Sequence, residues 1–172
     1  MGGAGLALPA VTISEAQAYV RIETGDEEAL LAGLIRMASA LCEAFLGQVV
    51  IAREFTADVP ASGCWQRLDL GPVQAISGVE AAGVALPSSS YAVDIDARGD
   101  GWVRVCDGAG ATRVRVSGTA GLAVDENGVP EPIRQGVLRL VAHLFTARDG
   151  DAGEPPAAVT ALWRPYRRMR VA

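Results

Sequence analysis

The chain has 172 residues, 50% of them hydrophobic, and a formal net charge of −5. This size fits one domain, and the apolar content is enough for a buried core without disulfides or structural metals. The negative charge provides no general attraction to nucleic acid. The charge is unevenly placed, however. Residues 1–133 hold 17 acidic residues and eight arginines, whereas residues 134–172 hold three acidic residues and seven arginines.

The cysteines Cys42, Cys64 and Cys106 are far apart, and none belongs to a pair with metal-ligand spacing. With a single histidine available besides, the sequence predicts reduced thiols, no metal site and no cofactor. No run of 18 apolar residues occurs, so no membrane span is expected. The apolar, glycine-rich residues 1–11 lack the basic start of a secretory signal and are expected to form a flexible arm.

A short helix is predicted at about 13–20. Thr12 is followed three residues later by Glu15, which is the spacing of a capping box. A helix begins favourably after such a pair, because the two side chains satisfy backbone donors that have no partner in the first turn.

A longer helix is predicted at about 26–46. Thr24 and Glu27 repeat the capping-box spacing, and Gly47 follows where a left-handed residue commonly ends a helix. Apolar residues recur at intervals of three and four, which predicts one buried stripe. The stripe comprises Leu30, Leu31, Leu34, Ile35, Ala38, Leu41, Cys42, Phe45 and Leu46.

Residues 49–118 form short segments that alternate apolar with polar residues and are separated by Gly, Pro, Ser and Asp. This pattern predicts antiparallel strands. The clearest segment places Val114 and Val116 on one face, with Arg113 and Arg115 on the other.

Helical periodicity returns after Pro130, in a helix expected to run to about 148. Its apolar stripe is expected to pack on the helix at 26–46. A last short helix is predicted before Pro165, which should end or kink it. The stripe comprises Ile133, Val137, Leu140, Val141, Leu144 and Phe145, with Leu138 at its margin.

The order of helices, strands and helices predicts a single α+β domain over residues 1–172. Residues 12–47 and 130–165 would form a small helical bundle contributed by both ends of the chain. Residues 49–118 would form an inserted antiparallel β-rich lobe, and residues 166–172 a basic C-terminal tail.

His143 is the only histidine, and it lies at steps of four residues from Arg139 and Gln135. The three share the polar face of their predicted helix, which favours a subunit interface or a solvated surface. A small hydrolase that uses His143 with a nearby Ser or Asp is the enzyme alternative. No G-x-S-x-G nucleophile elbow supports it.

Two loop segments contain residues found in ligand sites. Residues 94–101 place acids near a glycine, but Arg98 and Val105 would occupy ligand positions of an EF-hand, so a hairpin turn is favoured. Residues 106–112 are glycine-rich but no Lys-Ser/Thr pair or helix follows them, so a loop between strands is favoured over a phosphate site.

The C-terminal end combines arginines with aromatic residues, the composition favoured at the centres of protein interfaces. It is therefore a candidate partner-binding segment. An alternative is a nucleic-acid-binding module, because the same arginines suit phosphates. The candidate residues are Trp163, Arg164, Tyr166, Arg167, Arg168 and Arg170.

The motif order resembles the head–tail connector (adaptor) proteins of long-tailed bacteriophages and gene transfer agents. The resemblance covers nearly the whole chain, except that the N-terminal arm and the linker at 148–156 depart from the family's usual form. It rests on a helix pair ending in aromatic-x-Gly, a strand–Gly-Pro–strand step, a late strand with a second long helix, and a closing Tyr-Arg segment. These are residues 13–50, 68–80, 114–121 with 129–145, and 155–167.

The resemblance implies a structural, non-enzymatic role in the neck of a virion or phage-like particle assembled in the bacterial host cytoplasm. It implies a ring of about a dozen copies between the portal protein and tail-side neck proteins, through which DNA could pass. The C-terminal segment would face the portal and the β-rich lobe the tail. No catalytic residue and no membrane are implied.

Overall fold

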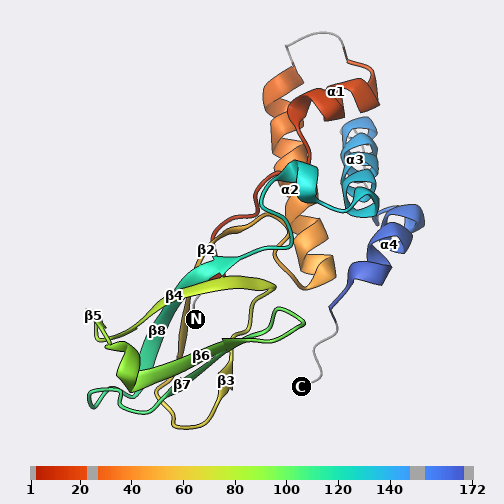
Figure 1. Ribbon diagram of the computed structural model, residues 1–172. Helices are drawn as coiled ribbons and strands as arrows, with labels where there is room; N and C mark the ends of the chain where they lie inside the picture. Colours follow the sequence, from red (N-terminus) through yellow and green to blue (C-terminus); the bar gives the residue numbers. More distant parts are fainter. Residues whose placement is uncertain (1–2, 23–26, 148–153, 169–172) are drawn as a thin grey trace. The chain divides into compact units, whose positions relative to one another are not determined.

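The computed structural model describes residues 3–22, 27–147 and 154–168. The chain folds into two compact units (Figure 1). The β unit comprises residues 1–5 and 52–122, and the helical unit comprises residues 6–51 and 123–172. The predicted α+β fold is confirmed, with helices from both ends of the chain and an inserted antiparallel β part.

Helix α1 (Ile13–Val20) begins at the predicted capping box. The Thr12 hydroxyl accepts a hydrogen bond from the Glu15 N–H at 3.2 Å, and the Glu15 carboxylate accepts one from the Thr12 N–H at 2.8 Å. The same carboxylate forms an ion pair with Arg134 of the helix α3 (Glu131–Thr146). One short motif therefore starts α1 and also joins it to α3.

Helix α2 (Glu28–Leu46) ends as predicted at Gly47, which has a φ of 65°. Thr24, from the second predicted capping box, lies outside the described residues. The predicted stripe is partly wrong, because Leu30 and Leu41 are each 42% exposed. Only one side of this stripe faces the core. Its buried members are Leu31, Ile35, Ala38, Cys42 and Leu46.

Helix α3 packs against α2 as predicted and also contacts α4 (Ala157–Trp163). The 3₁₀ turn η4 (Arg164–Tyr166) follows α4 and contains Pro165, the residue expected to end that helix. Five α3 stripe residues are buried and two, Leu144 and Phe145, are half-buried. The buried five are Ile133, Val137, Leu138, Leu140 and Val141.

The described part of the predicted arm contacts the protein at two places and is exposed between them, at Gly5, Leu6, Leu8 and Pro9. β1 (Gly3–Ala4) pairs with β2 (Arg53–Pro60) in the β unit. In the helical unit, Ala10 and Val11 are buried, and the Ala10 N–H donates to the Ser39 hydroxyl at 3.1 Å. An apolar residue gains from burial once its backbone donor finds a partner, and both conditions are met at Ala10.

The β unit contains two antiparallel sheets, of five strands in the order β1-β2-β8-β4-β5 and of three in the order β3-β7-β6. In β8, Val114 and Val116 are buried while Arg113 and Arg115 are exposed, as the alternation predicted. The remaining bounds are β3 (Gln66–Arg67), β4 (Val73–Ala81), β5 (Val84–Ala85), β6 (Tyr91–Ile95), β7 (Gly101–Val105), β8 (Arg113–Ala120), η2 (Ser88–Ser90) and η3 (Glu126–Gly128).

The contact between α3 and α4 depends on Gly136. A Cβ placed on Gly136 would lie 2.8 Å from two carbons of the Trp163 indole and closer still to its nitrogen. Gly33 of α2 is also in a helix interior, but a Cβ there would meet nothing nearer than an Arg36 nitrogen at 4.0 Å. These two glycines form a matched pair for a stability test.

We predict that Gly136→Ala destabilises the protein by about 1–3 kcal/mol, because the added methyl group overpacks the core. Gly33→Ala should instead stabilise it by about 0.5–1 kcal/mol, because alanine loses less backbone entropy in a helix. Urea denaturation followed by far-UV circular dichroism measures both free energies of unfolding. Equal stabilisation by the two substitutions would contradict the close packing of Trp163 on Gly136.

Candidate assembly interface

Trp163, the first residue of the candidate partner-binding segment, lies in the core of the helical unit. Its side chain is 2% exposed, and its Nε1–H donates to the Ile133 carbonyl at 3.2 Å. Its ring centroid is 5.8 Å from that of Phe45 on α2. Trp163 therefore joins α4 to α3 and α2, and its indole is covered in the single subunit.

The residues after Trp163 are fixed against the C-terminal end of α2. The Gln48 side-chain amide donates to the Tyr166 carbonyl, and the Arg168 N–H donates to the Leu46 carbonyl, both at 2.8 Å. The Arg167 guanidinium carbon lies 5.5 Å from the Phe45 ring centroid, a cation–π contact. The segment thus holds a defined position on α2 as far as residue 168.

This docking displays two cations at defined places. Arg164 and Arg167 are exposed, whereas Tyr166 and Arg168 are half-buried. Arg170 lies outside the described residues. Partner binding by this segment stays a prediction. Among its described residues, the two exposed arginines offer the most accessible positive charge.

The predicted polar face of α3 is present. Arg139 is exposed, Gln135 and His143 are half-buried, and Gln135 donates to the Glu131 carboxylate at 3.1 Å. Neither of two cavities in the molecule is lined by His143. The role of this face in subunit contact stays a prediction.

The hairpin interpretation of residues 94–101 is supported by the hydrogen bonds of Asp96. One carboxylate oxygen accepts the N–H groups of Arg98 at 2.8 Å and Asp100 at 2.9 Å, in the turn between β6 and β7. These hydrogen bonds hold the pKa of Asp96 below its usual value, and the bond from the Asp100 N–H has the largest effect. The Asp96 carboxylate therefore stabilises the turn. Among the described residues, no cluster of three His, Cys, Asp or Glu side chains could hold a metal ion.

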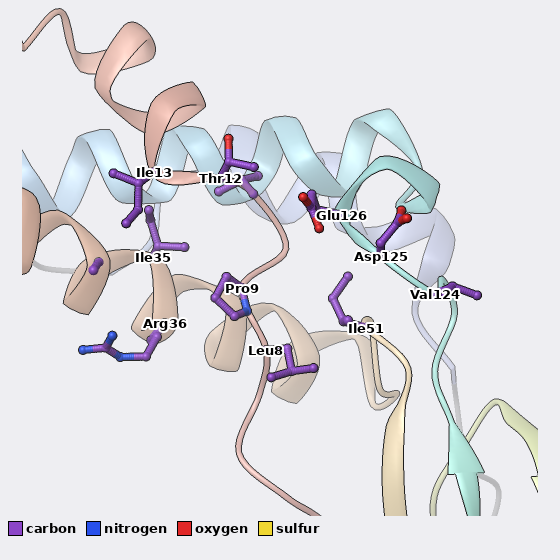
Figure 2. A pocket seen from close by; sticks show the side chains of 12 residues that line it. Leu8, Pro9, Thr12, Ile13, Ile35, Arg36, Ile51, Val124, Asp125 and Glu126 are labelled. Atoms are coloured by element: carbon purple, nitrogen blue, oxygen red, sulfur yellow. The ribbon is translucent and has the colours of Figure 1, made fainter.

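The helical unit contains a cavity of about 450 Å³ that the sequence analysis did not predict. We call it the arm–η3 cavity, since its walls are the docked arm, α2 and the segment at η3 (Figure 2). Its lining is mainly apolar, with the carboxylates of Asp125 and Glu126 beside it. The lining residues are Leu8, Pro9, Val11, Thr12, Ile13, Ala32, Ile35, Arg36, Ile51, Val124, Asp125 and Glu126.

A second cavity, of about 380 Å³, lies in the β unit and is lined mostly by small polar residues of β2, β4 and β8. Burial raises the pKa of the Cys42 thiol in α2, whereas Cys64 and Cys106 are exposed. All three thiols are free. None of these features groups a nucleophile with a base.

By length and composition alone, α2 is long and apolar enough to cross a membrane, as are many helices that are buried in a protein core. Six of its residues, including the polar Ser39, are buried in the protein. One side of α2 is therefore packed in the protein core.

No protein-family model and no curated protein matches the chain. Solved structures do match it. A chain in the neck of an empty gene transfer agent particle, computed with C6 symmetry, is 26% identical with a TM-score of 0.78. A chain in the neck of a native gene transfer agent particle, computed with C12 symmetry, is 22% identical with a TM-score of 0.77. A chain in the virion of a native gene transfer agent particle is 23% identical with a TM-score of 0.75.

Each match covers 100% of this chain and 97% of the other, so both the helical and the β parts are included. The resemblance to head–tail connector proteins is thereby confirmed: over its whole length, the chain has the fold of the neck proteins of phage-like particles.

Proposed function

We propose that this chain is a structural connector in the neck of a phage or gene transfer agent particle. The full-length match, at 26% identity, to a gene transfer agent neck chain carries the proposal. The C6 and C12 symmetries of the matched necks support a ring of identical copies. In such a ring, one face of each copy must meet a different face of the next.

The ring would join the portal protein to tail-side neck proteins, with DNA passing through its lumen. Arg164 is exposed, and the segment that carries it is hydrogen-bonded to Leu46 at the end of α2 and to Gln48 just beyond it, which supports a contact to the portal through Arg164. Assembly would occur in the host cytoplasm. The function is structural, and the proposal gives His143 no catalytic role.

Binding of nucleic acid through the C-terminal arginines is the second candidate. The exposure of Arg164 and Arg167 favours it. The net charge of −5 weighs against it, because an acidic body repels phosphates.

We predict that particles made without this protein have heads that lack tails. Electron microscopy of a deletion strain, with the gene restored in trans as the control, measures the fraction of tailed particles. Normal tailed particles in the deletion strain would refute the connector function.

We predict that Arg164→Glu lowers co-purification with the portal protein at least about tenfold, because a cation at an interface becomes an anion. Arg98→Glu, the same charge change in the exposed β6–β7 turn, is the matched control and should have little effect. Thermal unfolding should be nearly unchanged in both.

If the C-terminal arginines serve DNA instead, Arg164→Glu will leave portal binding intact. It will then reduce the affinity for duplex DNA and the steepness of its salt dependence. Gel-shift titrations at several salt concentrations distinguish this outcome from portal binding.

A further inference from the structure

The side of α2 that points away from the core is apolar and exposed. Leu30 and Leu41 are each 42% exposed, Met37 is 50% exposed, and Leu34 is half-buried. Their spacing of four, three and four residues places them along one side of the helix over about 16 Å. We call these four residues the outer stripe.

The outer stripe has no charged residue within it. Between residues 29 and 46 the charged side chains are Arg36 and Glu43, and helical periodicity places both on the other side of α2. A contiguous exposed apolar surface of this kind usually marks a contact site. The described residues of one copy leave the outer stripe exposed.

The C-terminal end of the outer stripe is basic. Phe45 follows Leu41 by one turn, and the exposed Arg167 guanidinium lies over its ring. This surface of the subunit is therefore an apolar ridge with a cation at one end.

The arm–η3 cavity has the complementary character. Its walls are largely apolar, and Leu8 is 41% and Val124 77% exposed. Asp125 and Glu126 supply two negative charges on the η3 side, against the one positive charge of Arg36 on α2. The α2 residues that line it, Ala32, Ile35 and Arg36, lie on the side of the helix opposite the outer stripe. Figure 2 shows Leu8, Ile35 and Ile51 around the cavity, with the two carboxylates on the η3 side.

We infer that the outer stripe of one copy docks into the arm–η3 cavity of the next copy in the ring. The inference rests on the proposed ring and names its contact. The outer stripe and the arm–η3 cavity share no residue and lie on opposite sides of α2, as a contact between two different faces of neighbouring copies requires. Arg167 at the end of the ridge matches the acidic residues beside the cavity in charge. A dry cavity of about 150 Å³ holds a benzene-sized group, so a volume of about 450 Å³ accommodates more than one stripe side chain.

Cross-linking in assembled particles tests the contact. The full chain carries Met37→Cys and Val124→Cys together with Cys64→Ser and Cys106→Ser, and Cys42 stays because it is buried. A flexible bismaleimide is used, because a direct disulfide requires Cα atoms within about 7 Å. The expected product is a ladder of species above the dimer on a denaturing gel. The single-cysteine variants cannot extend beyond dimers and serve as controls.

Charge reversal provides a second measurement. Arg167→Glu or Glu126→Arg alone should lower the yield of the ladder about tenfold, because like charges then meet at the contact. The two reversals combined should recover a large part of the lost yield, since the two reversed side chains again carry opposite charges while Asp125 stays acidic. Val84→Glu, at an exposed apolar residue of β5, is the control that should leave the ladder unchanged.

The outcomes separate this contact from the proposed function. A chain that is present in particles but yields at most dimers overturns the contact and leaves the connector function standing. Absence of the unmodified chain from particles overturns the function itself. Flotation of the purified full chain with phosphatidylglycerol vesicles, together with absence of the ladder, would show that a membrane covers the outer stripe and would overturn the inference.

Discussion

The helical unit depends on the packing of Trp163 against Gly136. The indole occupies the space that a side chain on Gly136 would fill, and its N–H satisfies the carbonyl of Ile133. This contact holds a seven-residue helix that is too short to be stable alone. Because Trp163 also meets Phe45, one side chain joins helices from both ends of the chain.

The docking of Trp163 determines what the C-terminal segment can offer a partner. The aromatic anchor stabilises the subunit, and the backbone beyond it bonds to the end of α2 through Gln48 and Leu46. The backbone of Arg164, Arg167 and Arg168 is thereby held in place. A cation held in place loses less conformational entropy on binding than one on a disordered tail.

Local signals predicted local structure well. The Thr12–Glu15 capping box, the Gly47 cap and the alternation in β8 depend on neighbouring residues alone, and each is present. The sequence could not show which side of α2 faces the core, because apolar residues occupy more than one side of that helix. The arm–η3 cavity also escaped prediction, since its walls join residues distant in sequence. The burial of Trp163 depends equally on a distant glycine.

The property of α2 that obscured its core-facing side is one that a ring subunit needs. A subunit must fold alone, and this requires one apolar side on its core helix. It must then assemble, and this favours a second apolar side on the same helix. An exposed apolar ridge promotes aggregation unless something opposes it. The net charge of −5 supplies that opposition through repulsion between free copies. In the inferred contact, assembly would depend on a specific match: the basic end of one copy's outer stripe would meet the acidic side of another copy's arm–η3 cavity, and the outer stripe would be withdrawn from water.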